Sequence, residues 1–169
     1  MRALGVLLFA IALAVAVTAS KPVLSTGQIQ AGVAKLDVTL PLGTPLAGYN
    51  HGPRRVPHWP LPQIKQYTTF MMPSVGILEP TFAKALVVDV GGERVIFVTI
   101  DAIGADGGLV NLAYDIAGDL GLTVPRENMI FSASHSHSGP GAVSAELLWA
   151  LAPATDMLVP DLQTMLATG

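Results

Sequence analysis

The stretch Asn128-Met-Ile-Phe-Ser-Ala-Ser-His-Ser-His-Ser-Gly-Pro-Gly141 decides the predicted fold, because a short apolar run ends there in two histidines and a glycine-rich loop. The run at 129–131 is bounded by polar residues, which is typical of a buried strand. Residues 138–141 break this pattern. We therefore predict that His135 and His137 lie at or just past the end of a strand, where open sheets place their ligand crevices.

The two histidines are candidate metal ligands. In an extended strand, side chains one residue apart point to opposite faces, so only one would face a given metal unless the loop bends. Neutral imidazole binds zinc, and zinc with an open coordination position activates water near neutral pH. The spacing fits a structural loop equally well, and the sequence offers no second ligand cluster.

The residues before this stretch predict a hairpin and a helix. Runs at 82–90 and 94–100 are β-branched and apolar, and the Gly-Gly pair between them favours a β-hairpin. Residues 107–122 carry apolar side chains at spacings of three and four, which predicts an amphipathic helix closed by Gly121. A hairpin, a helix and a further strand indicate an α/β fold with a crossover connection, if the last strand pairs in parallel.

The flanking segments add further elements. Residues 29–40 alternate loosely between apolar and polar and run into a proline-containing turn, which predicts a strand followed by a turn. Residues 142–152 and 160–167 are apolar enough to predict two more helices.

Two further positions are candidate site residues, each with two readings. Asp101 ends an apolar strand, where an acid orients a histidine or caps the helix that follows, and we favour the cap. In Leu46-Ala-Gly-Tyr49, Gly48 would let the backbone approach a ligand closely. The alternative, which we favour, is a tight turn packed by Tyr49.

Residues 51–62 contain four prolines and predict a loop, because proline removes a backbone donor and restricts the residue before it. Trp59 and the segment 67–73 make this region more apolar than an ordinary linker. A lid or a lipid-facing lip is one interpretation, and packing on the core is the one we favour. His51 and His58 are metal-ligand candidates here, although solvated loop histidines explain them more simply.

The amino terminus predicts a secretory signal peptide over residues 1–20. Arg2 precedes an uncharged, mostly apolar run at 3–17, which is too short for a typical membrane span, and small residues follow it. We expect a secreted protein with one domain over residues 21–169. The alternative is an uncleaved segment that anchors the protein to a membrane. The apolar run also raises the mean hydropathy of +0.54.

Composition narrows the class of protein. The chain of 169 residues has no cysteine, which excludes a disulfide framework and leaves stability to packing and to any bound metal. The net charge is −3, and the only adjacent basic pair is Arg54-Arg55. These charges argue against nucleic acid as a partner.

Ser132-Ala-Ser-His-Ser-His-Ser-Gly-Pro140 resembles the Ser-(Ala/Gly)-Thr-His-Thr-His-Ser-Gly-Pro signature of the neutral/alkaline, non-lysosomal ceramidases, with serine in place of both threonines. Four more segments resemble the family in the same order, at 32–39, 45–49, 83–88 and 95–101. The resemblance implies an α/β fold, a mixed β-sheet with flanking helices. This fold would form the N-terminal portion of a larger ceramidase-type catalytic domain.

The resemblance also implies roles for the histidines. His135 would be a zinc ligand, and His137 an active-site histidine near the metal-bound water or the substrate. The reaction would be zinc-dependent cleavage of ceramide to sphingosine and fatty acid, with the lipid presented at a membrane surface.

The family's other zinc ligands, a histidine, a glutamate and a tyrosine, lie further downstream, as does its catalytic serine. No histidine follows His137 and no tyrosine follows Tyr114. We therefore expect an N-terminal fragment that is inactive alone. The alternatives are a non-catalytic lipid- or metal-binding fragment, or a family member that hydrolyses a different amide or ester.

Overall fold

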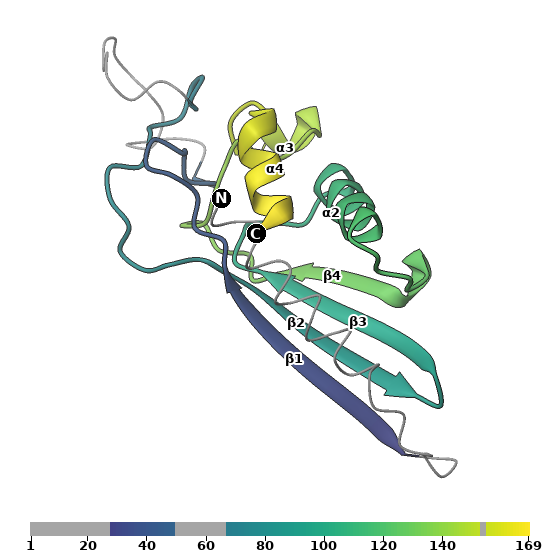
Figure 1. The fold of residues 1–169 in the computed structure, drawn as a ribbon. Helices are drawn as coiled ribbons and strands as arrows, with labels where there is room; N and C mark the ends of the chain where they lie inside the picture. Colours follow the sequence, from purple (N-terminus) through teal and green to yellow (C-terminus); the bar gives the residue numbers. More distant parts are fainter. Residues whose placement is uncertain (1–27, 50–66, 153–154) are drawn as a thin grey trace.

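The computed structural model describes residues 28–49, 67–152 and 155–169, which form one mixed four-stranded sheet with helices against one face (Figure 1). The strands are β1 (Ile29–Asp37), β2 (Phe82–Val90), β3 (Glu93–Ile100) and β4 (Met129–Ala133), in that spatial order. The first three pair antiparallel, and β4 runs parallel to β3. The predicted α/β class with a mixed sheet is confirmed.

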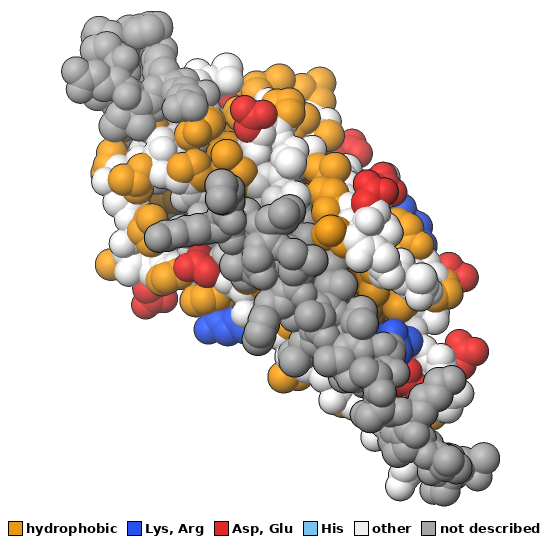
Figure 2. Space-filling model, viewed as in Figure 1, with side chains coloured by type: hydrophobic (Ala, Val, Ile, Leu, Met, Phe, Trp, Pro, Cys, Tyr) orange, Lys and Arg blue, Asp and Glu red, His pale blue; other side chains and the backbone are white. Residues whose placement is uncertain are grey.

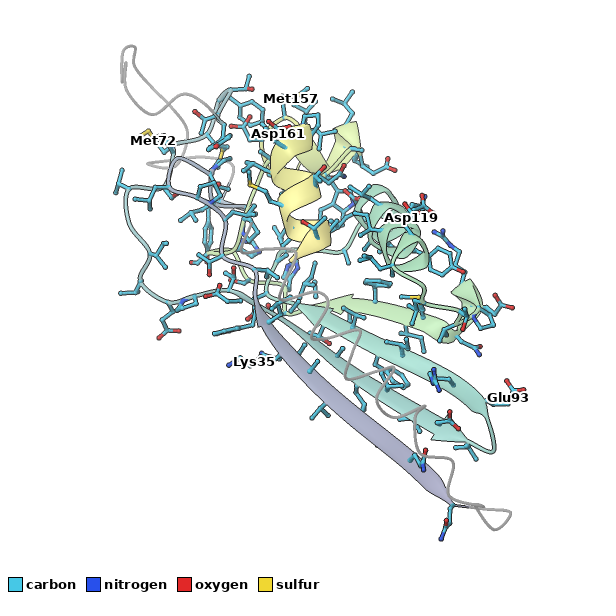
Figure 3. All side chains as sticks on the ribbon, viewed as in Figure 1. Lys35, Met72, Glu93, Asp119, Met157 and Asp161 are labelled. Carbon is cyan, nitrogen blue, oxygen red and sulfur yellow. The ribbon has the colours of Figure 1, made fainter. Side chains whose placement is uncertain are left out.

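The predicted hairpin is β2 and β3, and it turns through Gly91 and Gly92, both at positive φ. The buried carboxylate of Asp89 holds the turn, because it accepts hydrogen bonds from the Gly92 amide (2.9 Å) and from Arg94 (3.3 Å). Glu93, at the tip of the hairpin in Figure 3, already belongs to β3. The strand therefore begins one residue earlier than predicted.

The crossover from β3 to β4 contains α2 (Gly107–Asp119) and a short 3-10 helix, η2 (Arg126–Asn128). Asp106 caps α2 by accepting a hydrogen bond from the Leu109 amide (2.8 Å). The prediction that Asp101 caps this helix is wrong. The buried residues Ala102 and Ile103 follow Asp101 and separate it from the start of α2. Asp101 therefore lies at the end of β3, too far from the first turn of the helix to cap it.

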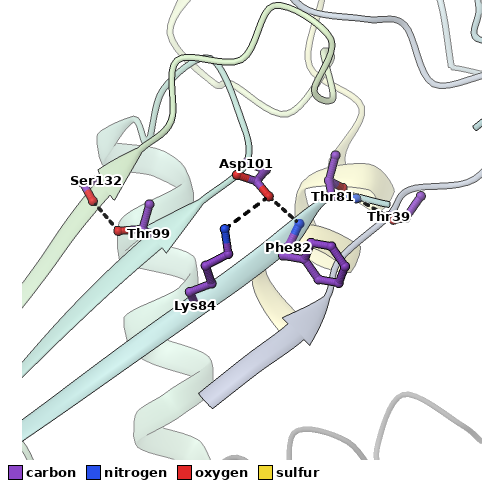
Figure 4. A network of polar contacts seen from close by, with 7 residues as sticks. All are labelled: Thr39, Thr81, Phe82, Lys84, Thr99, Asp101 and Ser132. Carbon is purple, nitrogen blue, oxygen red and sulfur yellow. Dashed lines mark hydrogen bonds and ion pairs between the residues drawn. The ribbon is translucent and has the colours of Figure 1, made fainter. Parts of the chain in front are cut away.

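Asp101 instead ties β3 to the start of β2. Its Oδ2 accepts a hydrogen bond from the Phe82 amide (3.0 Å) and lies 3.9 Å from Lys84 Nζ (Figure 4). Beside it, the hydroxyls of Thr99 and Ser132 join β3 to β4 across 2.8 Å.

Two helices follow β4, namely α3 (Leu147–Leu151) and α4 (Pro160–Thr168). The second matches its prediction closely, whereas the helix predicted over 142–152 is wrong for its first half. The Gly141 amide donates to the Pro45 carbonyl, and the Ala142 amide donates to the Thr155 carbonyl. These long-range bonds fix the backbone there, and Ala142 adopts a positive φ, so the helix does not start until after Glu146.

The core lies between the covered face of the sheet and helices α2 and α4. Burial of aliphatic side chains there supplies the main driving force for folding. Its buried members are Val38, Leu40, Ile100, Ala102, Leu109, Ala142, Val143, Leu162 and Leu166.

The other face of the sheet carries exposed apolar side chains in one row. Val33, Leu86, Phe97 and Ile130 are paired across the four strands. Lys35 lies on the same face, with Nζ 3.6 Å from the centre of the Phe82 ring (Figure 3). Hydrophobic side chains are also spread widely over the view in Figure 2, where basic side chains are sparse.

Some predictions fall outside the described residues. The signal peptide predicted over 1–20 lies there, and so does the proline-rich loop at 51–62 with His51 and His58. Within the described part of the chain, no helix has both the length and the hydropathy needed to cross a membrane.

Candidate functional site

The candidate site begins where β4 ends. Beyond Ala133 the backbone keeps pairing with the extension of β3, because the Ser134 amide donates to the Ile100 carbonyl (3.0 Å) and the Ser136 amide donates to the Ala102 carbonyl (3.1 Å). His135 and His137 therefore lie just past the strand's end, as predicted.

The segment bends at His135, which has φ of 58°. A non-glycine residue in this left-handed region is uncommon and marks a constrained position. The bend puts both imidazoles on one side, with ring centres 5.0 Å apart and the two Nε2 atoms 3.4 Å apart. Of the two arrangements considered from the sequence, the structure adopts the one in which both histidines face the same space.

His135 is oriented by a backbone carbonyl. Its Nδ1 lies 2.8 Å from the Ile103 oxygen. Because a carbonyl oxygen only accepts, the proton is on Nδ1, and in the neutral ring Nε2 carries the free lone pair. Metal-ligating histidines commonly make such a hydrogen bond through their second nitrogen.

His137 is held by residues 48–49. Gly48 has φ of 84°, and a Cβ at this position would overlap His137 Nδ1 and lie 2.8 Å from its Cγ. The Tyr49 ring centre lies 4.7 Å from that of His137. Gly48 therefore does permit a close backbone approach, but to a histidine ring, and Tyr49 packs on that same ring.

Backbone pairing fixes this arrangement. The Ala47 amide donates to the Gly139 carbonyl (3.0 Å), and Leu46 and Pro140 form an antiparallel bridge. A Cβ on Gly139 would lie 2.6 Å from the Asp101 carbonyl oxygen, so only glycine fits there. The glycine-rich end of the histidine segment is thus explained by close packing against its neighbours.

The described residues do not include a complete cluster of metal ligands. Within 28–49, 67–152 and 155–169, no cluster of three or more histidine, aspartate or glutamate side chains could hold an ion. The alternative prediction for Asp101, that it orients a histidine, is wrong. The Ile103 carbonyl orients His135, whereas Asp101 contacts Phe82 and Lys84.

A cleft of about 630 Å³ lies beside the same segment. Ser134, Ser136 and Ser138 line it, whereas the intervening histidines do not. The predicted crevice at the strand's end therefore exists, but the histidine pair faces away from it.

The histidine pair lies where a strand of the mixed sheet ends. No protein-family model matches the sequence, and no curated protein matches it significantly. Two solved structures share the fold at 19% identity over 83% of this chain: a ceramidase complexed with C2 (TM-score 0.64) and the neutral ceramidase from Pseudomonas aeruginosa (TM-score 0.65).

The chain spans about a fifth of each of these structures, 19% of the first and 20% of the second. The described unit therefore corresponds to one part of a larger fold. The ceramidase resemblance is confirmed for the fold, and identity at this level carries no statement about the reaction.

Proposed function

We propose that this chain supplies part of the zinc site of a ceramidase-type amide hydrolase, with His135 as a zinc ligand. The observation that carries the proposal is the pairing of two imidazoles at a strand end of a ceramidase-like fold, with Nε2 of His135 directed away from its Ile103 anchor.

The two nitrogens fit a zinc ion. Zinc binds imidazole at about 2.0–2.1 Å, so two nitrogens on one tetrahedral ion lie about 3.3 Å apart. The observed 3.4 Å places His137 Nε2 close enough to share the ion with His135 or to contact a water beside it. We assign the ligand role to His135, because its second nitrogen is the one held by a carbonyl.

His137 is proposed to move the proton. A group within hydrogen-bond reach of the attacking water takes its proton and then delivers it to the leaving amine nitrogen, as a general base and acid do. The packing of Tyr49 and of the Gly48 backbone keeps the His137 ring in place for this task. Zinc, when bound, supplies a polarised amide carbonyl and a water with pKa of about 7.

The proposed substrate is ceramide, which hydrolysis would convert to sphingosine and fatty acid. This assignment rests on the sequence motif and on the similarity to ceramidase structures. The leader predicted over residues 1–20 supports a secreted location, where the lipid would be met at a membrane surface.

A second candidate is a non-catalytic chain that binds metal weakly. It is favoured by the lack of a third ligand among the described residues and by the share of the similar structures that the chain spans. Measurable ceramide hydrolysis by the purified chain would exclude this second candidate. We expect no turnover, because the zinc site is incomplete without further ligands, and measurable turnover would overturn that expectation.

Zinc binding tests the shared part of both candidates. We expect His135→Ala to weaken zinc binding by at least about tenfold, since removal of a ligand costs more than loss of its outer partner. Asp161→Ala is the matched control, because it removes an exposed oxygen donor in the first turn of α4, outside the histidine pair, and should leave the affinity unchanged. Equal affinities for the wild type and His135→Ala, measured by calorimetry, would refute the ligand assignment.

A further inference from the structure

The cleft beside the histidine segment is formed by a chain segment that is held at both ends. At one end the Ser74 amide donates to the Thr44 carbonyl (3.0 Å). At the other, the Thr81 amide donates to Thr39 Oγ1 (2.9 Å), and the Val38 amide donates to the Thr81 carbonyl (2.9 Å). Residues 75–80, which we call the strap, are exposed between these anchors. The cleft lies between the strap and the strand end, with a volume in the range of small-molecule sites.

The lining of the cleft has a distinct chemical character. Among the described residues, two carboxylates, those of Glu79 and Asp101, line it, and no lysine, arginine or histidine does. The aliphatic lining residues are Leu40, Leu46, Ile77, Leu78, Pro80 and Pro140. The hydroxyl-bearing lining residues are Thr39, Thr44, Ser74, Thr81, Ser134, Ser136 and Ser138. Such a lining favours a ligand that is positively charged at one end and aliphatic at the other.

One polar atom that lines the cleft keeps unused hydrogen-bonding capacity. Both contacts of the Asp101 carboxylate use Oδ2, so Oδ1 keeps its acceptor capacity. Lys84 Nζ lies 3.9 Å from Asp101 Oδ2 and offsets part of the negative charge of the Asp101 carboxylate.

We propose that this cleft binds a protonated primary aliphatic amine. The ammonium group would lie at Asp101 and the serine hydroxyls, and the chain would run along Leu40 and the aliphatic side chains of the strap. This site is separate from the histidine pair, because the histidines do not line the cleft. The proposal therefore stands independently of the hydrolase assignment.

Calorimetry on the purified chain with three ligands of equal chain length tests the charge preference. Decylamine should bind most tightly, decanol less tightly and decanoate most weakly, because the two carboxylates repel an anion. Equal binding of all three, a preference for decanoate or no binding of decylamine would overturn the proposal.

Gly76 offers a test of location. A Cβ there meets nothing within 4 Å, so Gly76→Leu adds bulk to the cleft wall without a clash in the fold. We expect this variant to lose measurable decylamine binding. Gly118→Leu is the matched control, because Gly118 is also sterically open but lies on α2, away from the cleft. Unchanged binding by Gly76→Leu would place the amine elsewhere.

Charge variants with opposite expected signs complete the test. Glu79→Gln should weaken decylamine binding by about threefold to fivefold, the effect of one exposed ion pair. Lys84→Met should strengthen it by a similar factor, because Asp101 loses its competing cation. His135→Ala should leave amine binding unchanged, so loss of zinc binding and loss of amine binding report separately on the two proposals. Shifts opposite in sign to these would refute the role of the carboxylates.

Discussion

The backbone carbonyl of Ile103 decides which nitrogen of His135 faces the candidate site. It accepts a hydrogen bond from Nδ1 and thereby leaves Nε2 as the potential ligand atom. Gly48 acts in a comparable way on His137, because its lack of a side chain makes room for that ring. The sequence motif pointed to the two histidines, but not to Ile103, which acts through a carbonyl that every residue possesses.

Gly48→Ala is expected to destabilise the fold by about 2–4 kcal/mol, because the methyl group meets the His137 ring and the residue sits at positive φ. Chemical denaturation measures this loss. Gly32→Ala is the control, since a Cβ at Gly32 meets nothing within 4 Å and should leave stability nearly unchanged or slightly raised. Equal stability of the two variants would contradict the described packing around His137.

Asp156 is a second residue with a large expected effect. It is fully buried, and its Oδ2 accepts hydrogen bonds from the amides of Thr69 (2.9 Å), Phe70 (3.3 Å) and Met71 (3.0 Å). Asp156→Ala leaves these donors without that acceptor and should cost about 3 kcal/mol or more. Asp156→Asn should cost less, because asparagine keeps an acceptor and tolerates the positive φ.

Asp161→Ala is the control for Asp156, because Asp161 is exposed in the first turn of α4 (Figure 3). Its removal should cost no more than about 1 kcal/mol. If Asp156→Ala lowers the free energy of unfolding by no more than Asp161→Ala in the same denaturation assay, the three amide contacts of Asp156 do not stabilise the fold.

At the scale of elements, patterns within one segment were predictable and contacts between segments were not. The Gly-Gly pair predicted the β2–β3 hairpin, and the spacing of apolar residues predicted α2. Residues 142–146 looked helical by composition, yet Gly141 and Ala142 bond to Pro45 and Thr155, which no local pattern displays. The cap residue of α2 was predicted wrongly for the same reason. Burial of Ala102 and Ile103 puts the start of the helix at Gly107, so Asp106 is its cap.

Asp106→Ala is expected to destabilise the protein by about 1 kcal/mol through loss of the α2 cap. Amide hydrogen exchange should accelerate at Leu109, whose N–H loses its acceptor. Asp119→Ala, at the opposite end of the same helix, should not destabilise it, because an acid is unfavourable near a helix C-terminus. Unchanged exchange at Leu109 in Asp106→Ala would show that the cap is not needed.

At the scale of the whole molecule, the sheet has one face covered by helices and one face with an exposed apolar row. The sequence motifs predicted the ceramidase-like fold, which the similar structures confirm. The direction in which the site faces was not predictable. It depends on the bend at His135, which turns the two imidazoles away from the serine-lined cleft.

The most direct test of the central claim is magnetic resonance of the His135 ring in nitrogen-labelled protein, recorded before and after addition of zinc. The account predicts a ring proton on Nδ1, held by the Ile103 carbonyl, and a zinc-induced shift that is largest at Nε2. A ring protonated at Nε2, or one whose nitrogen resonances do not respond to zinc, would contradict it.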